Sequence, residues 1–136
     1  MPKIQRALFS CHDKTGIIEL AQLLHEFNVE IISTSGTLAL LGEAGVPSVS
    51  IADFTGVPEM MGGRVKSLHP KVHAGLLGIR DSKLHQEQMQ AHEWPWIDLV
   101  VVNLQPVNEL MNVPGIKTDE VVDQIDIGGA AMLRSA

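Results

Sequence analysis

Two segments of the sequence combine hydroxyl side chains, glycine and positive charge in a way that suits phosphate binding. Each segment follows a predicted strand and begins a predicted helix, where free backbone N–H groups and a partial positive charge attract anions. Either turn alone is equally consistent with ordinary helix capping, but the two together favour a phosphate pocket. The candidate ligands are Ser10, Lys14, Thr15, Thr34, Ser35, Gly36 and Thr37.

A basic, glycine-rich segment, "GGRVKSLHPKVHAG" (residues 62–75), is the second candidate for chemistry. No acidic residue lies between Met60 and Arg80, although the formal net charge of the chain is -6. Arg64 can bind phosphate or carboxamide oxygens through several N–H donors, and Ser67 adds a hydroxyl. Lys66 can donate a proton or stabilise an oxyanion. Surface charges normally mix signs, so this segment favours a functional loop over a solvated one.

His69 and His73 have the i, i+4 spacing of some zinc-binding helices. Pro70 disfavours helical geometry at His69, no third ligand has suitable spacing, and Cys11 is the only cysteine. We therefore expect no metal site. Instead, His69 is expected to orient the loop by hydrogen bonding and His73 to pack on its helix.

Two further polar residues are candidates for the same site. Asp126 precedes Gly128 and Gly129 in "QIDIGG". It is either a helix-capping or turn aspartate, or a carboxylate that accepts a proton or orients a lysine beside glycine N–H donors. Asn103 ends the most hydrophobic predicted strand and can bind a polar group of a ligand.

The elements that must position these residues follow from hydrophobic patterning. Strands are predicted over 4–10, 29–33, 46–51 and 97–104, and a long loop over 52–69. Helices are predicted over about 17–27 with Thr15 as N-cap, 38–44, from Pro70, 82–92, 118–125 and from about Asp126. This order predicts an α/β fold with three layers, a mainly parallel sheet and helices on both faces. Ligands of such sheets bind beyond the carboxyl ends of the strands.

Size and charge narrow the class of protein. The chain has 136 residues and is 45% hydrophobic, which fits one domain spanning residues 1–136. Its negative charge argues against general binding of nucleic acid. No apolar run approaches the roughly 20 residues of a membrane span, and the start lacks the apolar core of a signal peptide. We expect a cytoplasmic protein with a small-molecule ligand.

Five segments in order resemble one known family: "SCHDKTGI", "STSGTLALL", "ADFTGVPEMMGGRVKSLHPKVHAGLL", "IDLVVVNLQP" and "QIDIGGAAMLRSA". They resemble the IMP cyclohydrolase domain, the N-terminal half of the bifunctional purine-biosynthesis enzyme AICAR formyltransferase/IMP cyclohydrolase. The resemblance covers essentially the whole chain. It implies a methylglyoxal-synthase-like fold, no cofactor or metal, a homodimer, and a formyltransferase domain in the same native polypeptide.

The resemblance also implies a reaction and a site. The carboxamide nitrogen of formyl-AICAR attacks the formyl carbon, and loss of water closes the ring to give IMP. By resemblance, Lys66 and Asp126 take part in proton transfer, while Asn103 and the backbone of Gly128 and Gly129 line the base. The 5′-phosphate is assigned to Ser10, Lys14, Thr15, Thr34, Gly36, Thr37, Arg64 and Ser67.

Three features depart from the family pattern. Gln105 stands where the family usually has a tyrosine, and it can form hydrogen bonds but cannot supply a phenol. His12 stands where the family usually has a serine near the phosphate, and it can still donate to phosphate. The chain stops at Ala136, before a family lysine that is thought to help catalysis. We therefore expect a domain truncated at its C-terminus, in which binding survives better than turnover.

Two other functions remain open. One is a non-catalytic nucleotide- or phosphate-binding regulatory module of the same fold, like the effector domain of carbamoyl-phosphate synthetase. Gln105 and the missing lysine favour it, and an assay of IMP formation separates it from the enzyme. The other is methylglyoxal synthase, which is weaker because its catalytic aspartate, in that enzyme's own sequence setting, is not found here.

Overall fold

A computed structural model of the chain describes residues 3–136. Its centre is a sheet of four parallel strands in the order β3-β2-β1-β4. The strands are β1 (Arg6–Cys11), β2 (Glu30–Ser33), β3 (Val49–Ser50) and β4 (Leu99–Asn103). Because β1 pairs with both β2 and β4, the carboxyl ends of all three meet at one edge of the sheet.

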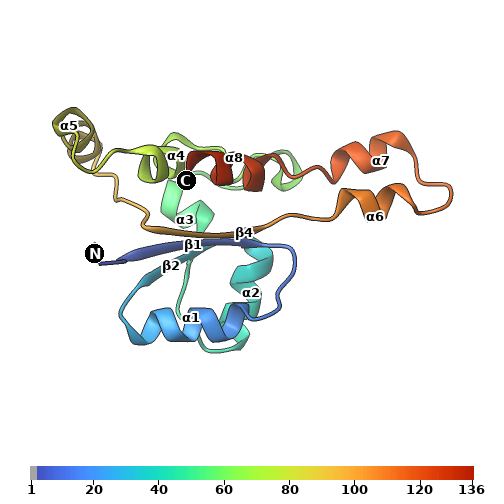
Figure 1. The fold of residues 1–136 in the computed structure, drawn as a ribbon, viewed down its shortest axis with the longest axis horizontal. Coiled ribbons are helices and arrows are strands. Elements are labelled where there is room, and N and C mark those ends of the chain that lie inside the picture. Colours follow the sequence, from blue (N-terminus) through green and yellow to red (C-terminus); the bar gives the residue numbers. More distant parts are fainter. Residues whose placement is uncertain (1–2) are drawn as a thin grey trace.

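Helices cover both faces of this sheet, which confirms the predicted three-layer α/β fold (Figure 1). One face carries α1 (Ile17–Glu26) and α2 (Ser35–Glu43). The other carries α3 (Ile51–Thr55), α4 (Pro70–Leu77) and α8 (Ile127–Ser135), and α8 contacts both α4 and β4. A 3₁₀ turn, η1, spans Met61–Gly63. The remaining helices are α5 (Lys83–Ala91), α6 (Val107–Met111) and α7 (Thr118–Asp123), and α6 and α7 extend together beyond the sheet.

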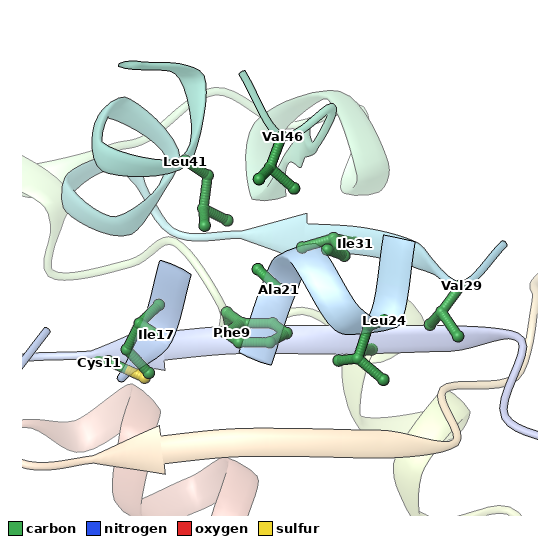
Figure 2. Close-up of a cluster of buried hydrophobic side chains, with 10 residues drawn as sticks. Phe9, Cys11, Ile17, Ala21, Leu24, Val29, Ile31, Leu41 and Val46 are labelled. Atoms are coloured by element: carbon green, nitrogen blue, oxygen red, sulfur yellow. The ribbon is translucent and has the colours of Figure 1, made fainter. Parts of the chain in front are cut away.

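The core consists of one apolar cluster on each face of the sheet. Alternate residues of β1 supply both: Phe9 and Cys11 belong to the cluster beneath α1 and α2, and Leu8 belongs to the opposite one. Figure 2 shows the first cluster, in which Phe9 and Ile31 of the strands lie against side chains of both helices. Burial on both faces explains why the strands are almost continuously apolar.

Most predicted elements are present, with shifted ends and some errors. The third predicted strand, 46–51, contains a strand of only two residues. Residues 52–55, predicted as loop, belong to α3, which Ser50 caps by accepting a hydrogen bond from the Asp53 N–H at 3.0 Å. The helix α6 was not predicted, and α2 begins at Ser35 rather than near residue 38.

The prediction of Thr15 as the N-cap of the first helix was wrong. Gly16 occupies that position with a φ of 74°, a left-handed conformation that glycine adopts readily. The Thr15 hydroxyl instead donates to Asp13.

The two histidines of the basic segment have structural roles. His69 forms a hydrogen bond, as predicted, but to the helix that follows the loop: it caps α4, since its Nδ1 accepts from the Lys71 N–H at 3.1 Å. The Nδ1 of His73 lies 2.7 Å from the Ser135 hydroxyl and so links α4 to the last turn of α8. Across residues 3–136, no helix has the length and hydropathy to cross a bilayer.

Candidate functional site

A pocket of about 510 Å³ lies at the carboxyl ends of β1, β2 and β4. Five separate parts of the chain form its walls: the turns after β1 and β2, the basic segment, the end of β4, and the junction between α7 and α8. The lining residues are Ser10, Cys11, His12, Lys14, Thr34, Gly36, Gly62, Gly63, Arg64, Lys66, Ser67, Asn103, Gln105, Asp123, Gln124, Ile125, Asp126, Ile127 and Gly128.

The predicted residues therefore divide into two groups. Eleven of them line the pocket: Ser10, His12, Lys14, Thr34, Gly36, Arg64, Lys66, Ser67, Asn103, Asp126 and Gly128. Four do not line it: Thr15, Ser35, Thr37 and Gly129. The side chains of the second group bond to other residues or, for glycine, allow close packing.

Lys14 brings a positive charge to the start of α2. Its Nζ donates to the Cys11 carbonyl and to the Thr37 hydroxyl, which lies 3.2 Å away. A Cβ atom at Gly36 would lie only 3.7 Å from the same Nζ, so the ammonium group sits against the first turn of α2. Thr37 is fully buried, and its hydroxyl holds the Lys14 ammonium group by accepting this hydrogen bond. A lysine beside a helix N-terminus is a suitable environment for a phosphate group.

The loop after β1 is held in shape by hydrogen bonds that Asp13 forms with Thr15 and with Asn103. The carboxylate of Asp13 accepts from the Thr15 hydroxyl at 2.7 Å and the Thr15 N–H at 2.9 Å. These donors, the hydroxyl first, lower the pKa of the exposed Asp13 carboxyl. The Asn103 side chain accepts from the Asp13 N–H and donates to the Asp13 carbonyl, each at 2.8 Å. Because the hydroxyl and the backbone N–H of Thr15 both donate to Asp13, neither is free to bind a ligand.

Ser35 is similarly engaged outside the pocket. Its hydroxyl donates to the Glu59 carboxylate at 2.9 Å, which ties the start of α2 to the segment that leads into the basic loop.

The basic loop turns toward the pocket through three consecutive residues in the left-handed region. Their φ angles are 54° at Met61, 65° at Gly62 and 81° at Gly63. Two of the three positions are glycine, for which this conformation carries no steric penalty. The turn brings the next residues, Arg64, Lys66 and Ser67, to the pocket wall.

The two cations of this loop differ in their partners. The Nη2 of Arg64 lies 2.9 Å from the Asp123 carboxylate, and its Nη1 donates to the Met61 carbonyl at 3.1 Å. Both side chains of the ion pair are more than half exposed, so the pair contributes little to stability. Lys66 is half-buried, and its side chain has no ion pair or hydrogen bond with any residue among 3–136.

Asp126 is the N-cap of α8, as one of its two interpretations predicted. Its Oδ1 accepts a hydrogen bond from the Gly129 N–H at 2.7 Å. The second oxygen, Oδ2, accepts no hydrogen bond from the part of the chain that the structure describes, and the residue lines the pocket. One oxygen of the carboxylate thus positions the group while the other remains available to a ligand.

The two glycines after Asp126 permit close packing. A Cβ atom at Gly128 would collide with the Ser67 hydroxyl. One at Gly129 would lie 2.6 Å from Leu104 Cδ2 and 2.5 Å from Asp126 Oδ2. The start of α8 can approach both the basic loop and the end of β4 only because these side chains are absent.

Sequence reasoning did not place several lining residues in the site. Asp123, Gln124, Ile125 and Ile127 form the wall between α7 and α8, and their position next to "DIGG" is the only signal that points to them. Cys11 also lines the pocket, but burial raises the pKa of its thiol, whose Sγ donates to the Val101 carbonyl at 3.4 Å. The thiol is therefore protonated at neutral pH and a poor nucleophile.

Within residues 3–136, no three His, Cys, Asp or Glu side chains converge in a way that could hold a metal ion. The chemistry that the arrangement supports is anion binding through Lys14 and the N-terminus of α2. Proton transfer would involve Lys66 of the basic segment and Asp126 at the start of α8.

Comparisons with known proteins give consistent results. The sequence profile of a family described as "MGS-like domain" matches residues 16–131. The chain is 52% identical over 136 residues to the bifunctional purine biosynthesis proteins PurH of Neisseria meningitidis and Magnetococcus marinus. It is also 52% identical over 132 residues to PurH of Anoxybacillus flavithermus. The match includes 97–100% of this chain but 26% of each relative, so the chain spans about a quarter of their length.

A solved structure is also similar. The structure titled "Crystal structure of ForH" superposes with a TM-score of 0.79 at 34% sequence identity. The match covers 98% of this chain and 68% of that one, so it extends over the whole of the fold described above.

Proposed function

The chain belongs to the MGS-like domain family. We propose that it is an IMP cyclohydrolase domain, which binds a purine ribotide and closes the second ring of the purine base. Its identity of 52% to purine-biosynthesis proteins over the full chain supports a role in that pathway. The substrate in this proposal is formyl-AICAR and the product is IMP. We place this activity in the cytoplasm.

The observation that carries the proposal is the set of charged and polar groups that line the pocket. Lys14, hydroxyl groups and the N-terminus of α2, which covers one face of the sheet, suit a 5′-phosphate. The start of α8, which lies on the opposite face of the sheet from α2, adds the unoccupied oxygen of Asp126, and the basic segment adds Lys66, which has no protein partner among residues 3–136. A ligand with a phosphate at one end and a reacting amide at the other fits this distribution of charge.

In the proposed reaction, the carboxamide nitrogen forms a bond to the formyl carbon and loses a proton. Oδ2 of Asp126 accepts that proton, while Oδ1 stays bonded to the Gly129 N–H and keeps the carboxylate in place. The ammonium of Lys66 stabilises the charge that develops on the formyl oxygen and protonates it. In the second step the protonated carboxyl of Asp126 returns its proton to the hydroxyl, which leaves as water, while the neutral amine of Lys66 takes the proton of the former formamide nitrogen, so that a C=N double bond completes the purine ring and both side chains regain their starting states.

A regulatory module that binds a nucleotide without turnover is the second candidate. One observation favours it: Gln105 lines the pocket at the position where the resemblance leads one to expect a phenol. A glutamine can bind the ligand by hydrogen bonds but is a poor proton donor or acceptor.

The test is an assay of IMP formation by the purified chain supplied with formyl-AICAR, followed by the ultraviolet absorbance of the product. Turnover above the uncatalysed rate supports the enzyme. Binding of IMP without turnover supports the regulatory module, and the absence of both rejects the proposal. Release of methylglyoxal from dihydroxyacetone phosphate would instead support a methylglyoxal synthase.

Two further proposals concern assembly. We propose a homodimer, because Leu104, Val122, Ile125 and Ile127 leave 41–61% of their surface exposed around α7 and α8. Light scattering of the purified chain tests this.

We also propose that the native polypeptide carries a formyltransferase domain, since the similar relatives are named bifunctional and are about four times as long. The reading frame of the native gene tests that.

A further inference from the structure

We propose that Asn103 is a positioning residue that holds the phosphate-binding loop in shape, and that Gln105 is the carboxamide that contacts the ligand. The phosphate-binding loop is residues 12–16, between β1 and α1. The nature of the ligand rests on the proposed function, whereas the loop-holding role rests on contacts within the chain.

The first step is the geometry of Asn103 and Asp13. The Oδ1 of Asn103 accepts from the Asp13 N–H and its Nδ2 donates to the Asp13 carbonyl, both at 2.8 Å. One side chain thus satisfies both backbone groups of a residue 90 positions away. The register of the sheet makes this contact possible, because Asn103 pairs with Cys11, two residues before Asp13.

The second step is how this contact reaches the phosphate end of the pocket. Asp13, fixed by Asn103, accepts two hydrogen bonds from Thr15 and so closes the loop on itself. Lys14 lies between these two residues, and its side chain is directed to Thr37 and the start of α2. Hydrogen bonds therefore connect the end of β4, the loop and the cation that would bind phosphate.

The third step is the contrast with Gln105. Both carboxamides line the pocket, but each polar atom of Asn103 is engaged by Asp13. The side chain of Gln105 makes no hydrogen bond to any residue within 3–136 and is half-buried. Because Gln105 is only half-buried, its carboxamide can exchange bonds with water for bonds with a ligand at little cost. Gln105 is therefore the one of the two that is available to the ligand.

The two roles predict opposite binding profiles for Asn103→Ala and Gln105→Ala. Removing Asn103 takes two hydrogen bonds from the loop, so affinity for IMP and for inorganic phosphate should fall about tenfold. Affinity for inosine, which lacks the phosphate, should stay unchanged. Gln105→Ala should weaken IMP and inosine about equally and leave inorganic phosphate unchanged. Titrations followed by nuclear magnetic resonance measure all three ligands, and a loss of inosine affinity in Asn103→Ala equal to that of IMP overturns the proposal.

Amide hydrogen exchange of the unliganded protein separates this inference from the proposed function. Asn103→Ala should expose the Asp13 N–H to exchange, while Gln105→Ala, which removes a carboxamide that makes no hydrogen bond to the loop, should leave it protected. Unchanged protection in Asn103→Ala overturns the loop-holding role, even if IMP is the ligand. If the wild-type chain binds no IMP, the proposed function fails and the exchange result still decides the role of Asn103. In a protein that turns over, Asn103→Ala should raise KM about tenfold and change kcat less than about twofold.

Discussion

Lys66 differs from the other lysine and arginine side chains that line the pocket, because no residue within 3–136 engages its ammonium group. Lys14 bonds to Thr37, and Arg64 pairs with Asp123. The proposed reaction needs a cation that can move its proton or its charge to the substrate. An ammonium group that is not committed to a protein carboxylate is better suited to that role than a paired one.

Lys66→Ala should accordingly lower kcat by about two to four orders of magnitude, the usual contribution of a positioned acid or base. Affinity for IMP should change much less. Steady-state kinetics with formyl-AICAR measure the effect. Lys83→Ala, which removes the same charge from the highly exposed surface of α5, is the matched control and should leave kcat unaltered. A normal rate in Lys66→Ala would remove this residue from the mechanism.

Gly128 is a second position that matters for the pocket, because it has no Cβ atom. Its missing side chain allows the Ser67 hydroxyl to lie against the start of α8. In Gly128→Ala, the new methyl group must displace the buried Ser67 hydroxyl from the start of α8, so affinity for IMP should fall about tenfold, as overpacking typically costs about 1–3 kcal/mol. Calorimetric titration measures this loss.

Gly42→Ala provides the matched control for that substitution. Gly42 lies within α2, and a Cβ atom there would contact nothing within 4 Å. Alanine is the better helix former, so this variant should bind IMP normally and be slightly more stable. Equal affinities for the two variants would show that close packing at Gly128 does not shape the pocket.

At the scale of elements, the well-predicted ones are those with a strong repeat of apolar residues. β1, β4 and α1 have such patterns and fall close to their predicted ranges. α3 and α6 have five residues each, which is little more than one turn, so no helical period can be recognised in them. Their formation depends on capping and on contacts with the sheet, which the sequence does not display directly.

In the candidate site, too, features with a local sequence signal could be predicted and those that depend on distant contacts could not. The turns after β1 and β2 could be predicted because the chemistry of a helix start is local. The contacts of Asn103 with Asp13 and of Arg64 with Asp123 join distant parts of the chain, and depend on strand register and on the path of α7. Thr15 was assigned to phosphate because its type is suitable, but its neighbour Asp13 takes both of its donors.

The N-cap of α3 gives a test at this scale. Ser50 accepts the Asp53 N–H at 3.0 Å, and Ser50→Ala should lower the free energy of unfolding by about 1 kcal/mol. Ser48→Ala, two residues earlier, makes the same chemical change at a hydroxyl with no hydrogen bond to the described residues, and should have a smaller effect. Urea denaturation measures both, and equal effects would mean that the cap does not stabilise α3.

For the whole molecule, stability is expected to come from the two apolar clusters that sandwich the sheet. Leu41 is completely buried in the cluster of Figure 2, in the layer where α2 packs on β1 and β3. Leu41→Ala should lower the free energy of unfolding by about 2–5 kcal/mol, through lost burial and the cavity that remains. Leu23→Ala, at a half-exposed position of α1, should change it by less than about 1 kcal/mol. Thermal or urea unfolding distinguishes the two, and similar losses would contradict this description of the core.

The pocket wall between α7 and α8 also has a consequence for biosynthesis on the ribosome. Every strand of the sheet precedes residue 104, so the sheet and its first helices can assemble while the chain is still growing. Asp123, Asp126 and Gly128 are translated afterwards. A nascent chain whose sheet has already formed would therefore lack part of the pocket wall until these last segments emerge, so capture of the proposed ligand would report completed translation of this region.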